Sequence, residues 1–463
     1  VLTDCVSLTS ASGGRPDVRG AISDLTASRH SGASIYLDWK SPLEHHEVDW
    51  RAEGQSGWNT IANVWSPFHN VIMLEPQTAY EFKVRGLPPR LIDENGKPAA
   101  AAPALESSVF RAATAKLEPK RWEGLQLWPT QHIASFPDQQ CYPCIDVYKG
   151  AFYVVEARQY GIYLSRLRER DFAVEWTKQL VPPVKPVSCY QGIPDTCIFQ
   201  DKLWVMWNRQ ATGDPKYQIM DSRQLVLQYD LATGQISESL TIESTKPGCG
   251  TWEGGLTVYQ GRLWMMWMEV WLNPAGRRRT QIVLRPYEDG RFTETIVFPC
   301  PSEYPYGPSI NVFGDRLILL WSDLAAGEQR PDFEPLYCTF FDGKDFSPSV
   351  LIHGEGRSRY AKGAQLGDDF YCVYKCNTRY PKSGYMYHDL ALTRISADAR
   401  QVKTTYWVDD VKYNSSPDMI QHDGGLMAVY GKFEHAYGNP RDPALNHGSF
   451  IGRIRPDTAP SSN

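Results

Sequence analysis

A chain of 463 residues with 42% hydrophobic residues is long enough to build two or more domains. Its net charge of -5 and its lack of any long Lys/Arg block argue against nucleic acid as the main partner. No apolar run approaches the roughly 20 residues that a membrane helix needs, so we expect no membrane span. The chain begins at Val1 without a charged and apolar leader, so either a signal has been removed or there was none, and we expect a secreted or extracellular protein.

The first predicted domain covers residues 18–115, where short runs alternate apolar and polar positions between turn residues. Residues 74–85 read LEPQTAYEFKVR, which places Tyr80, Phe82 and Val84 on one face of a strand. This stretch resembles fibronectin type III domains, whose L-x-P-x-T-x-Y-x-F-x-V-R pattern it matches. The resemblance implies an immunoglobulin-like sandwich in which Tyr80 makes the tyrosine-corner hydrogen bond, and a spacer or docking role towards a cell-surface partner.

The second predicted domain covers residues 119–463, where one pattern recurs six times. An apolar strand, a turn and a strongly apolar strand follow one another, and the last usually ends in an aromatic residue. The repeats begin at Pro143, Pro194, Gly254, Pro308, Gly363 and Pro417. Their spacing of about 51 to 60 residues suits the four-stranded blades of a six-bladed β-propeller. The sixth repeat runs out of chain after its third strand, so we expect residues 122–128 to supply the fourth and close the ring.

The doublet of strands resembles the blades of sialidase-type and related carbohydrate-active propellers. The turns at residues 289–292 and 342–346 add to that likeness. However, the S-x-D-x-G-x-T-W box of sialidases is missing, and so is the signature of WD40 repeats. The resemblance therefore implies a shared architecture only.

In each blade of a propeller, one loop leads into the innermost strand and another leaves the second strand. Both loops open on the same face of the ring. The first set of loops carries an aromatic residue in every repeat: Tyr142, Tyr190, Trp252, Tyr306, Tyr360 and Tyr413. The aligned position in the second set carries Arg158, Arg209, Glu269, Asp323, Cys376 and Lys432. Rings suit the C–H faces of sugars and charged groups suit their hydroxyls, so we expect a glycan ligand. The alternative is that the rings plug the channel and the charges form a solvated rim.

Cleavage of a glycoside usually needs two carboxyl groups, one as acid and one as base or nucleophile. Glu269 and Asp323 come from neighbouring repeats at the same height, and we predict them as the catalytic pair, with Glu253 as a further catalytic candidate. Asp195 is a further carboxyl group of interest, and we predict that it binds the substrate.

Basic residues of the same face are candidates for binding an acidic sugar. Arg158 and Arg209 would also lower the pKa of a neighbouring carboxyl group. A lyase remains open as well, because His435, Tyr437 and Lys432 lie close together in the sequence and would supply a base near a uronate.

Three functions stay open at this point. The residues of the predicted face differ from repeat to repeat, which favours one central pocket of a glycoside hydrolase or polysaccharide lyase. A lectin-like or host-surface binding protein and a protein-binding propeller are the alternatives. Cys141 and Cys144 form a C-x-x-C without a second pair, and no dinucleotide motif occurs, so we expect neither a metal nor a cofactor.

Overall fold

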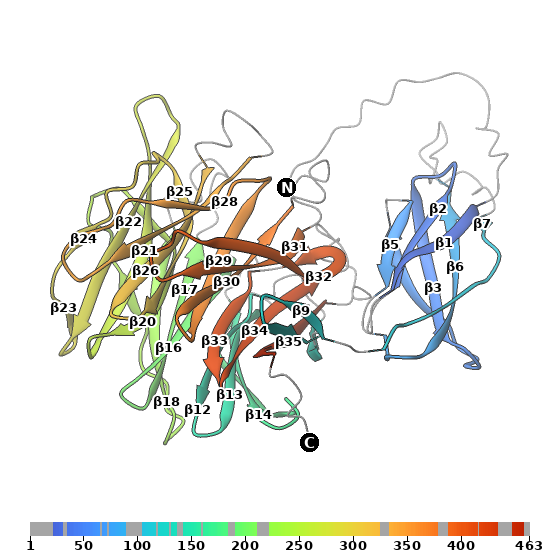
Figure 1. The fold of residues 1–463 in the computed structure, drawn as a ribbon, viewed down its shortest axis with the longest axis horizontal. Coiled ribbons are helices and arrows are strands. Elements are labelled where there is room, and N and C mark those ends of the chain that lie inside the picture. Colours follow the sequence, from blue (N-terminus) through green and yellow to red (C-terminus); the bar gives the residue numbers. More distant parts are fainter. Residues whose placement is uncertain are drawn as a thin grey trace, which may run out of the picture. The chain divides into compact units, whose positions relative to one another are not determined.

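The computed structural model (Figure 1) consists of β-strands throughout the residues that it describes. The chain divides into two compact units with the main boundary between Thr114 and Ala115, and each unit is treated by itself. The described residues are 22–30, 35–64, 67–71, 74–88, 104–116, 119–128, 131–136, 142–158, 161–183, 190–210, 222–324, 333–377, 388–414, 416–433 and 447–457.

The first unit contains two antiparallel sheets. One has the order β1 (Ser23–His30), β2 (Ile35–Lys40), β5 (Phe68–Val71). The other has the order β4 (Asn59–Val64), β3 (His45–Ala52), β6 (Ala79–Leu87), β7 (Leu105–Glu106), and β8 (Phe110–Ala113) also pairs with β6. Trp39 of β2 meets His46 of β3 with ring centroids 5.4 Å apart, so side chains of the two sheets pack against each other. Tyr80, Phe82 and Val84 are buried, as their period of two predicts.

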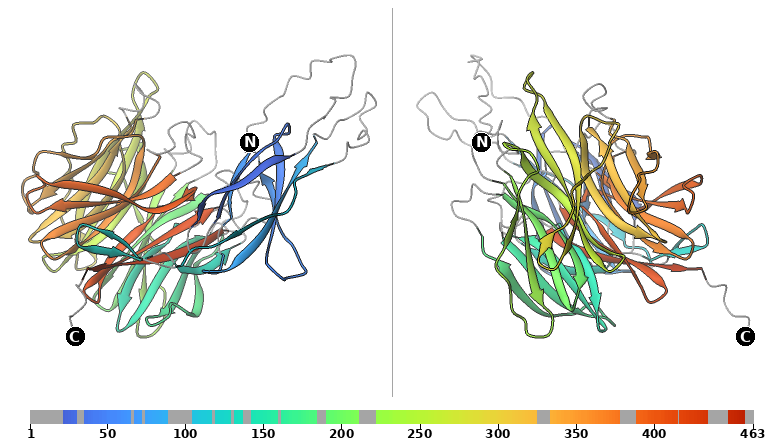
Figure 2. Two further views of the ribbon diagram at one scale, coloured as in Figure 1. Left: turned by 45° about the vertical axis from the view of Figure 1, so that its right-hand side comes forward. Right: turned by 90° about the vertical axis from the view of Figure 1, so that its left-hand side faces the viewer.

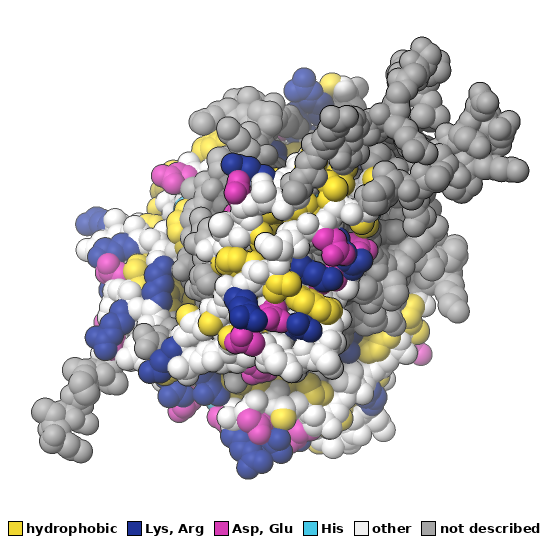
Figure 3. All heavy atoms as spheres, turned by 90° about the vertical axis from the view of Figure 1, so that its right-hand side faces the viewer, with side chains coloured by type: hydrophobic (Ala, Val, Ile, Leu, Met, Phe, Trp, Pro, Cys, Tyr) yellow, Lys and Arg dark blue, Asp and Glu magenta, His cyan; other side chains and the backbone are white. Residues whose placement is uncertain are grey.

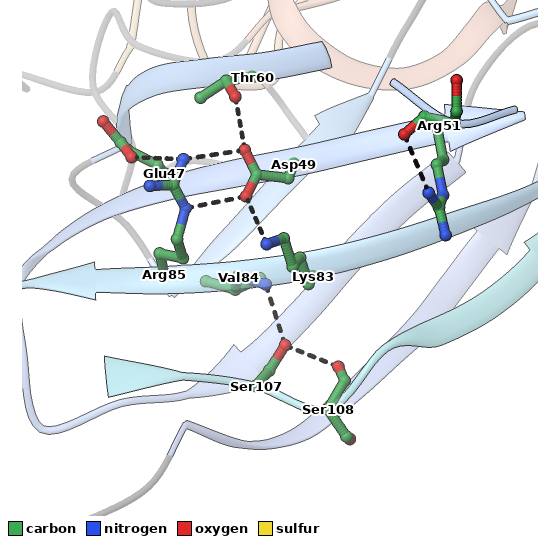
Figure 4. Close-up of polar contacts among 10 residues, drawn as sticks. Glu47, Asp49, Arg51, Thr60, Lys83, Val84, Arg85, Ser107 and Ser108 are labelled. Carbon is green, nitrogen blue, oxygen red and sulfur yellow. Dashed lines mark hydrogen bonds and ion pairs between the residues drawn. The ribbon is translucent and has the colours of Figure 1, made fainter. Parts of the chain in front are cut away.

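Paired charges cover the second of these sheets (Figure 4). Asp49 of β3 is 2% exposed and receives Nε of Arg85 at 2.8 Å. Lys83 lies 3.5 Å from the same carboxylate, and Thr60 donates its hydroxyl to it. Burial alone would raise the pKa of Asp49, but the hydrogen bonds from Arg85 and Thr60 outweigh burial and lower it. In the space-filling view of Figure 3, basic and acidic side chains likewise lie next to one another.

The second unit begins with four separate antiparallel sheets, each in chain order. The first contains β12 (Cys144–Tyr148), β13 (Ala151–Arg158), β14 (Gly161–Arg168) and β15 (Val174–Val181). The second contains β16 (Tyr190–Phe199), β17 (Lys202–Gln210), β18 (Arg223–Asp230) and β19 (Leu240–Ile242). The third contains β20 (Gly250–Tyr259), β21 (Arg262–Leu272), β22 (Arg278–Glu288), β23 (Arg291–Phe292) and β24 (Ile296–Val297). The fourth contains β25 (Pro305–Phe313), β26 (Arg316–Asp323), β27 (Leu336–Phe341) and β28 (Val350–His353).

The remaining two sheets are joined at their edges. The fifth contains β29 (Ser358–Leu366), β30 (Asp369–Cys376), β31 (His388–Ser396) and β32 (Val402–Asn414). The sixth contains β33 (Asp418–His422), β34 (Gly425–Phe433) and β35 (His447–Pro456), together with β9 (Lys120–Trp122), β10 (Leu125–Leu127) and β11 (Gln131–Phe136). The end of β32 pairs with β34 and links the two sheets.

The six sheets form a closed ring, which Figures 1 and 2 show from three directions. Their innermost strands touch in the cyclic order β12, β16, β20, β25, β29, β33 and back to β12. This arrangement is a β-propeller, so the predicted all-β propeller is confirmed. The fibronectin III identity of the first unit stays a prediction.

Tight turns join the innermost strand of a sheet to the second strand. Lys149 and Gly150 both have positive φ angles, of 48° and 73°, and lie between the paired residues Tyr148 and Ala151. Two-residue loops of this type match the right-handed twist of the strands that they connect. The pairs 200–201, 260–261 and 423–424 repeat the same geometry in other sheets.

Each pair of neighbouring sheets encloses its own hydrophobic cluster, so six clusters hold the ring together. The aromatic residues that end the second strands are fully buried in these clusters: Trp207, Trp267, Trp321, Tyr374 and Tyr430. Because both faces of each sheet are covered, the second strands are almost continuously apolar rather than alternating. This is the sequence signal that predicts the repeat.

The last sheet is closed by the beginning of the unit. Leu125, Gln126 and Leu127 of β10 pair with the end of β35, from Pro456 back to Ile454. Both leucines are buried against the cluster between the fifth and sixth sheets. Of the stretch 122–128 that was predicted to supply the fourth strand, Leu125–Leu127 therefore do pair with the sixth repeat as β10, and β9 then forms the outer edge of this sheet.

Candidate functional site

A small hollow lies where the innermost strands begin. It is lined by one residue at the equivalent position of every sheet, and each of these precedes Pro, Gly or Ala: Tyr142, Ile193, Glu253, Gly307, Tyr360 and Ser416. We call this set the mouth ring. Apart from its two tyrosines its members are chemically unlike one another, whereas the scaffold around them repeats.

The backbone of the mouth ring departs from regular strand geometry. Pairing of the innermost with the second strand shifts register at this position in the second to fifth sheets. Ile193, Glu253 and Tyr360 have positive φ angles of 50°, 25° and 56° there. These bulges leave the ladder unpaired and re-aim the side chains, a device that is common beside active sites. After Glu253 only glycine fits, since a Cβ on Gly254 would lie 2.0 Å from the carbonyl oxygen of Met266.

Glu253 is the carboxyl group of the mouth ring and is 1% exposed. The hydroxyl groups of Tyr306 and Tyr360 donate to its Oε1 at 3.1 and 3.2 Å. Both tyrosines are half-buried, and Tyr360 also lines the hollow. Burial raises the pKa of Glu253 to about 7, although the tyrosine hydrogen bonds oppose this shift. A carboxyl group with this pKa exchanges protons near neutral pH, as a general acid or base must.

A basic pair lies beside these tyrosines. Arg359 is held by both oxygens of the buried Glu334 and covers the Tyr306 ring at 4.9 Å from its centre. Lys375, across the strand pair from Arg359, is 4% exposed. Burial, and then the charge of Arg359, lower the pKa of Lys375 to about 7.

Charged groups also form the floor beneath the mouth ring. Lys362 makes an ion pair with Asp195 at 2.7 Å, and Asp195 receives the backbone N–H of Leu256 at 2.8 Å. Asp418 receives the N–H of Ile145 at 2.8 Å, and burial raises its pKa to about 6. Lys362 and Asp418 line both the hollow and a second cavity of about 340 Å³ further along the channel.

Asp146 lines this second cavity too. Burial raises its pKa to about 8. Among the described residues no group of three or more His, Cys, Asp or Glu side chains is placed to hold a metal ion.

The predicted pair Glu269 and Asp323 does not line either cavity. Glu269 is completely buried inside the third sheet, where the backbone and hydroxyl of Thr245 and the amide of Gln281 donate to it. Asp323 receives the hydroxyl of Ser302 next to its own strand. Each carboxylate is engaged by its own sheet, and the structure does not bring the two together at the mouth.

The other predicted residues fall into two groups. Tyr142, Tyr306 and Tyr360 lie at or beside the mouth, together with Asp195 in the floor below. Trp252 packs instead into the cluster between the third and fourth sheets.

The two predicted arginines lie on the second strands of the first and second sheets, Arg158 on β13 and Arg209 on β17. Arg158 pairs with Glu156 at 2.6 Å, and Arg209 is exposed on β17. The side chains of Tyr190, Tyr413 and Lys432, and the whole of His435 and Tyr437, lie outside the described residues.

Sequence reasoning missed Lys362, Lys375 and Arg359. In the fifth repeat the sequence alignment begins at Gly363, but strand pairing makes Ala361 the equivalent of Pro308, so the aligned residues are displaced by two. The sequence does contain a signal for Lys375. It directly follows the apolar run 370–374, at a strand position where a buried residue is normally uncharged.

Comparison with known proteins identifies the fold class but no family. No protein-family model matches the chain, and no curated protein matches it. Among solved structures it is similar to a mutant of Trypanosoma rangeli sialidase displaying trans-sialidase activity, at 11% identity and a TM-score of 0.51, over 73% of this chain and 59% of that chain. It is also similar to Trypanosoma rangeli sialidase in complex with the inhibitor DANA, at 12% identity and a TM-score of 0.50, over 68% and 55% of the two chains.

An α-L-arabinofuranosidase from Lactobacillus brevis aligns at 11% identity with a TM-score of 0.41, over 68% of this chain and 90% of that chain. The chain spans less than two thirds of the length of the sialidase chains that it matches. At these identities the likeness to the sialidase chains defines a β-propeller fold and leaves activity to be argued from the site.

Proposed function

We propose that the second unit is a six-bladed propeller that binds a glycan at its mouth and cleaves a glycosidic bond there. The observation that carries this proposal is a buried carboxyl group, Glu253, held by two tyrosine hydroxyls at the mouth of the ring. Its raised pKa keeps a large fraction of it protonated at neutral pH, which is the state that a general acid needs.

The second carboxyl group of the reaction is Asp418. It lines the same hollow, but it comes from β33, which stands opposite β20 in the ring of six innermost strands. Its lower pKa of about 6 makes it the more ionised of the two groups at neutral pH. Glu253 would give its proton to the leaving oxygen, and Asp418 would accept a proton from the attacking water.

Aromatic rings of the mouth supply the binding surface. Tyr142 and Tyr360 line the hollow and Tyr306 lies beside them, and all three are half-buried. Such rings pack against the C–H faces of a sugar and add apolar contact area. Since the six members of the mouth ring are all different in kind except for two tyrosines, we infer one asymmetric ligand rather than one ligand per blade.

For the first unit we infer a fibronectin III-like sandwich over residues 18–115 that docks to a cell-surface partner. Two observations support this assignment. The unit contains a three-stranded and a five-stranded sheet, and the pattern of residues 74–85 lies in β6 and directly before it. We also propose secretion. Seven cysteines of the described residues are free thiols, so this proposal depends on the sequence alone. No described helix is long and apolar enough to span a membrane.

The test combines a glycan array with a reducing-end assay on the same preparation of the full chain. We expect binding to a restricted set of glycans and release of reducing ends from them, with release lost in Glu253→Gln. Binding without release by the wild-type protein would establish a lectin-like function instead. A protein that binds no glycan and releases no reducing ends would contradict the proposal.

A further inference from the structure

Lys375 is a buried charged residue at a position where the other sheets carry none. Strand pairing makes it equivalent to the following residues of the other second strands: Ala157, Asn208, Met268, Ser322 and Gly431. All five are uncharged and buried. Since the scaffold does not need a lysine here, the fifth sheet carries it for a local reason.

The contacts of Lys375 lead to the mouth. Its Nζ lies 4.6 Å from the centre of the Tyr360 ring, which is the geometry of a cation–π contact. The hydroxyl of that ring lies 3.2 Å from Oε1 of Glu253. One side chain therefore connects the lysine to the proposed acid.

The charges that act on Lys375 come from three strands or their ends. Arg359 of β29 lies opposite it, Glu334 precedes β27, and Glu253 belongs to β20. Arg359 disfavours the charged form of the lysine, and the two glutamates favour it. Lys375 and Glu253 both have a pKa of about 7, so they change protonation over the same pH range.

We propose that Lys375 is a positioning residue that holds the Tyr360 ring and sets the protonation state of Glu253. When the lysine is charged, it stabilises the Glu253 carboxylate and is attracted to the face of Tyr360. When it is neutral, this stabilisation is lost and the carboxyl group holds its proton more tightly. The charge on Lys375 therefore sets how readily Glu253 gives up its proton in the free protein. This inference rests on the proposed function only in giving Glu253 the role of acid.

The test follows the Glu253 carboxyl group directly by infrared difference spectroscopy of the full chain without ligand. The protonated carboxyl band that disappears in Glu253→Gln is assigned to this residue, and its pH midpoint is measured. In Lys375→Met the midpoint should rise by about half a pH unit or more, because a positive charge is lost. In Lys375→Arg, which stays charged, it should fall.

Lys178→Met is the matched control, since Lys178 also lies over a tyrosine ring, that of Tyr229, at 5.2 Å. It should leave the Glu253 midpoint unchanged. Far-UV circular dichroism checks folding, and Lys375→Gln replaces Lys375→Met if the latter does not fold. An unchanged midpoint in both the neutral and the Arg variants of Lys375 would overturn the inference.

The outcome is independent of turnover. If the midpoint moves as expected but no glycan is cleaved, the coupling stands and the proposed function fails. If glycans are cleaved but the midpoint does not move, the proposed function stands and the coupling between Lys375 and Glu253 fails. Where cleavage is found, the acidic and alkaline limbs of its pH profile should shift in the two Lys375 variants in the same directions as the infrared midpoint.

Discussion

Tyr306 and Tyr360 belong to neighbouring sheets, and their hydroxyl groups meet at 2.9 Å. Their rings cross with centroids 5.8 Å apart, and both hydroxyls reach the same oxygen of Glu253. One oxygen of the carboxyl group is therefore held by residues of two different sheets. A group with so little freedom is suited to a task that depends on orientation.

Glu253→Gln should abolish glycan cleavage while keeping the fold. The amide is similar in shape to the carboxyl group but cannot transfer the proton, so we expect a loss of about 100-fold or more in kcat. Release of reducing ends measures this loss. An unaffected rate would remove Glu253 from the mechanism.

Glu269→Gln provides the contrasting variant. Its carboxylate accepts hydrogen bonds from Thr245 and Gln281 inside the third sheet. Because one oxygen would become a donor facing other donors, we expect a loss of about 1–3 kcal/mol in the free energy of unfolding. Urea denaturation measures it. Loss of cleavage at full stability would instead support the pair predicted from the sequence.

The comparison of Glu253 with Glu269 illustrates what the sequence can predict. Strands, sheet order and ring closure follow from apolar runs and turns, because burial on both faces imposes a pattern that repeats. The direction of a side chain at a bulge does not follow from such a pattern. Glu253 lies at a register shift with a φ of 25°, whereas Glu269 stays in regular pairing with Thr251. The sequence therefore predicts Glu253 only as a further catalytic candidate beside the pair Glu269 and Asp323, although of these three residues it is Glu253 that lines the hollow.

The stability of the propeller should decrease as the pH rises from about 4.5 to about 8. Burial raises the pKa values of Asp418, Glu253 and Asp146 to about 6, 7 and 8, so the folded state binds their protons more tightly than the unfolded state. These groups contribute their full stabilisation at pH values below their pKa values in the unfolded chain. The contribution is lost as the pH rises through their pKa values in the folded state. Urea midpoints between pH 5 and pH 8 measure the trend, and Asp146→Asn should flatten it.

The first unit should respond to pH in the opposite direction. The pKa of Asp49 is lowered in the folded state, so its contribution is present above its ordinary range and is lost as the pH falls through the lowered value. Denaturation of residues 18–115 as a separate protein, followed by tryptophan fluorescence, tests this. Asp49→Asn should remove much of the acid sensitivity; an equally steep loss in the variant would contradict the role of Asp49.

Lys362→Met should destabilise the propeller strongly. Lys362 is the ion-pair partner of the buried Asp195, and two further aspartates, Asp146 and Asp418, line the same cavity. Removing the positive charge leaves the buried Asp195 carboxylate uncompensated, at a cost of about 3–5 kcal/mol. Lys344→Met, at an exposed pair with Asp345, should change stability by less than about 0.5 kcal/mol. Equal effects in the two variants would refute the role of Lys362.

Leu127→Ala should weaken ring closure. Leu127 is 2% exposed and belongs to the strand that pairs with β35. We expect a loss of about 2–4 kcal/mol in thermal or urea denaturation. Leu351→Ala, at a side chain that is 49% exposed, is the control and should cost much less.

Pairing of β10 with β35 also affects how the protein is made. Gln126 and its hydrogen-bond partner Asp457 are 331 residues apart, so the first strand of the ring leaves the ribosome long before its partner. At about 5–20 residues per second this delay is on the order of tens of seconds. During translation the nascent chain must keep the apolar residues of β10 from associating wrongly, and the ring becomes complete only when synthesis reaches β35.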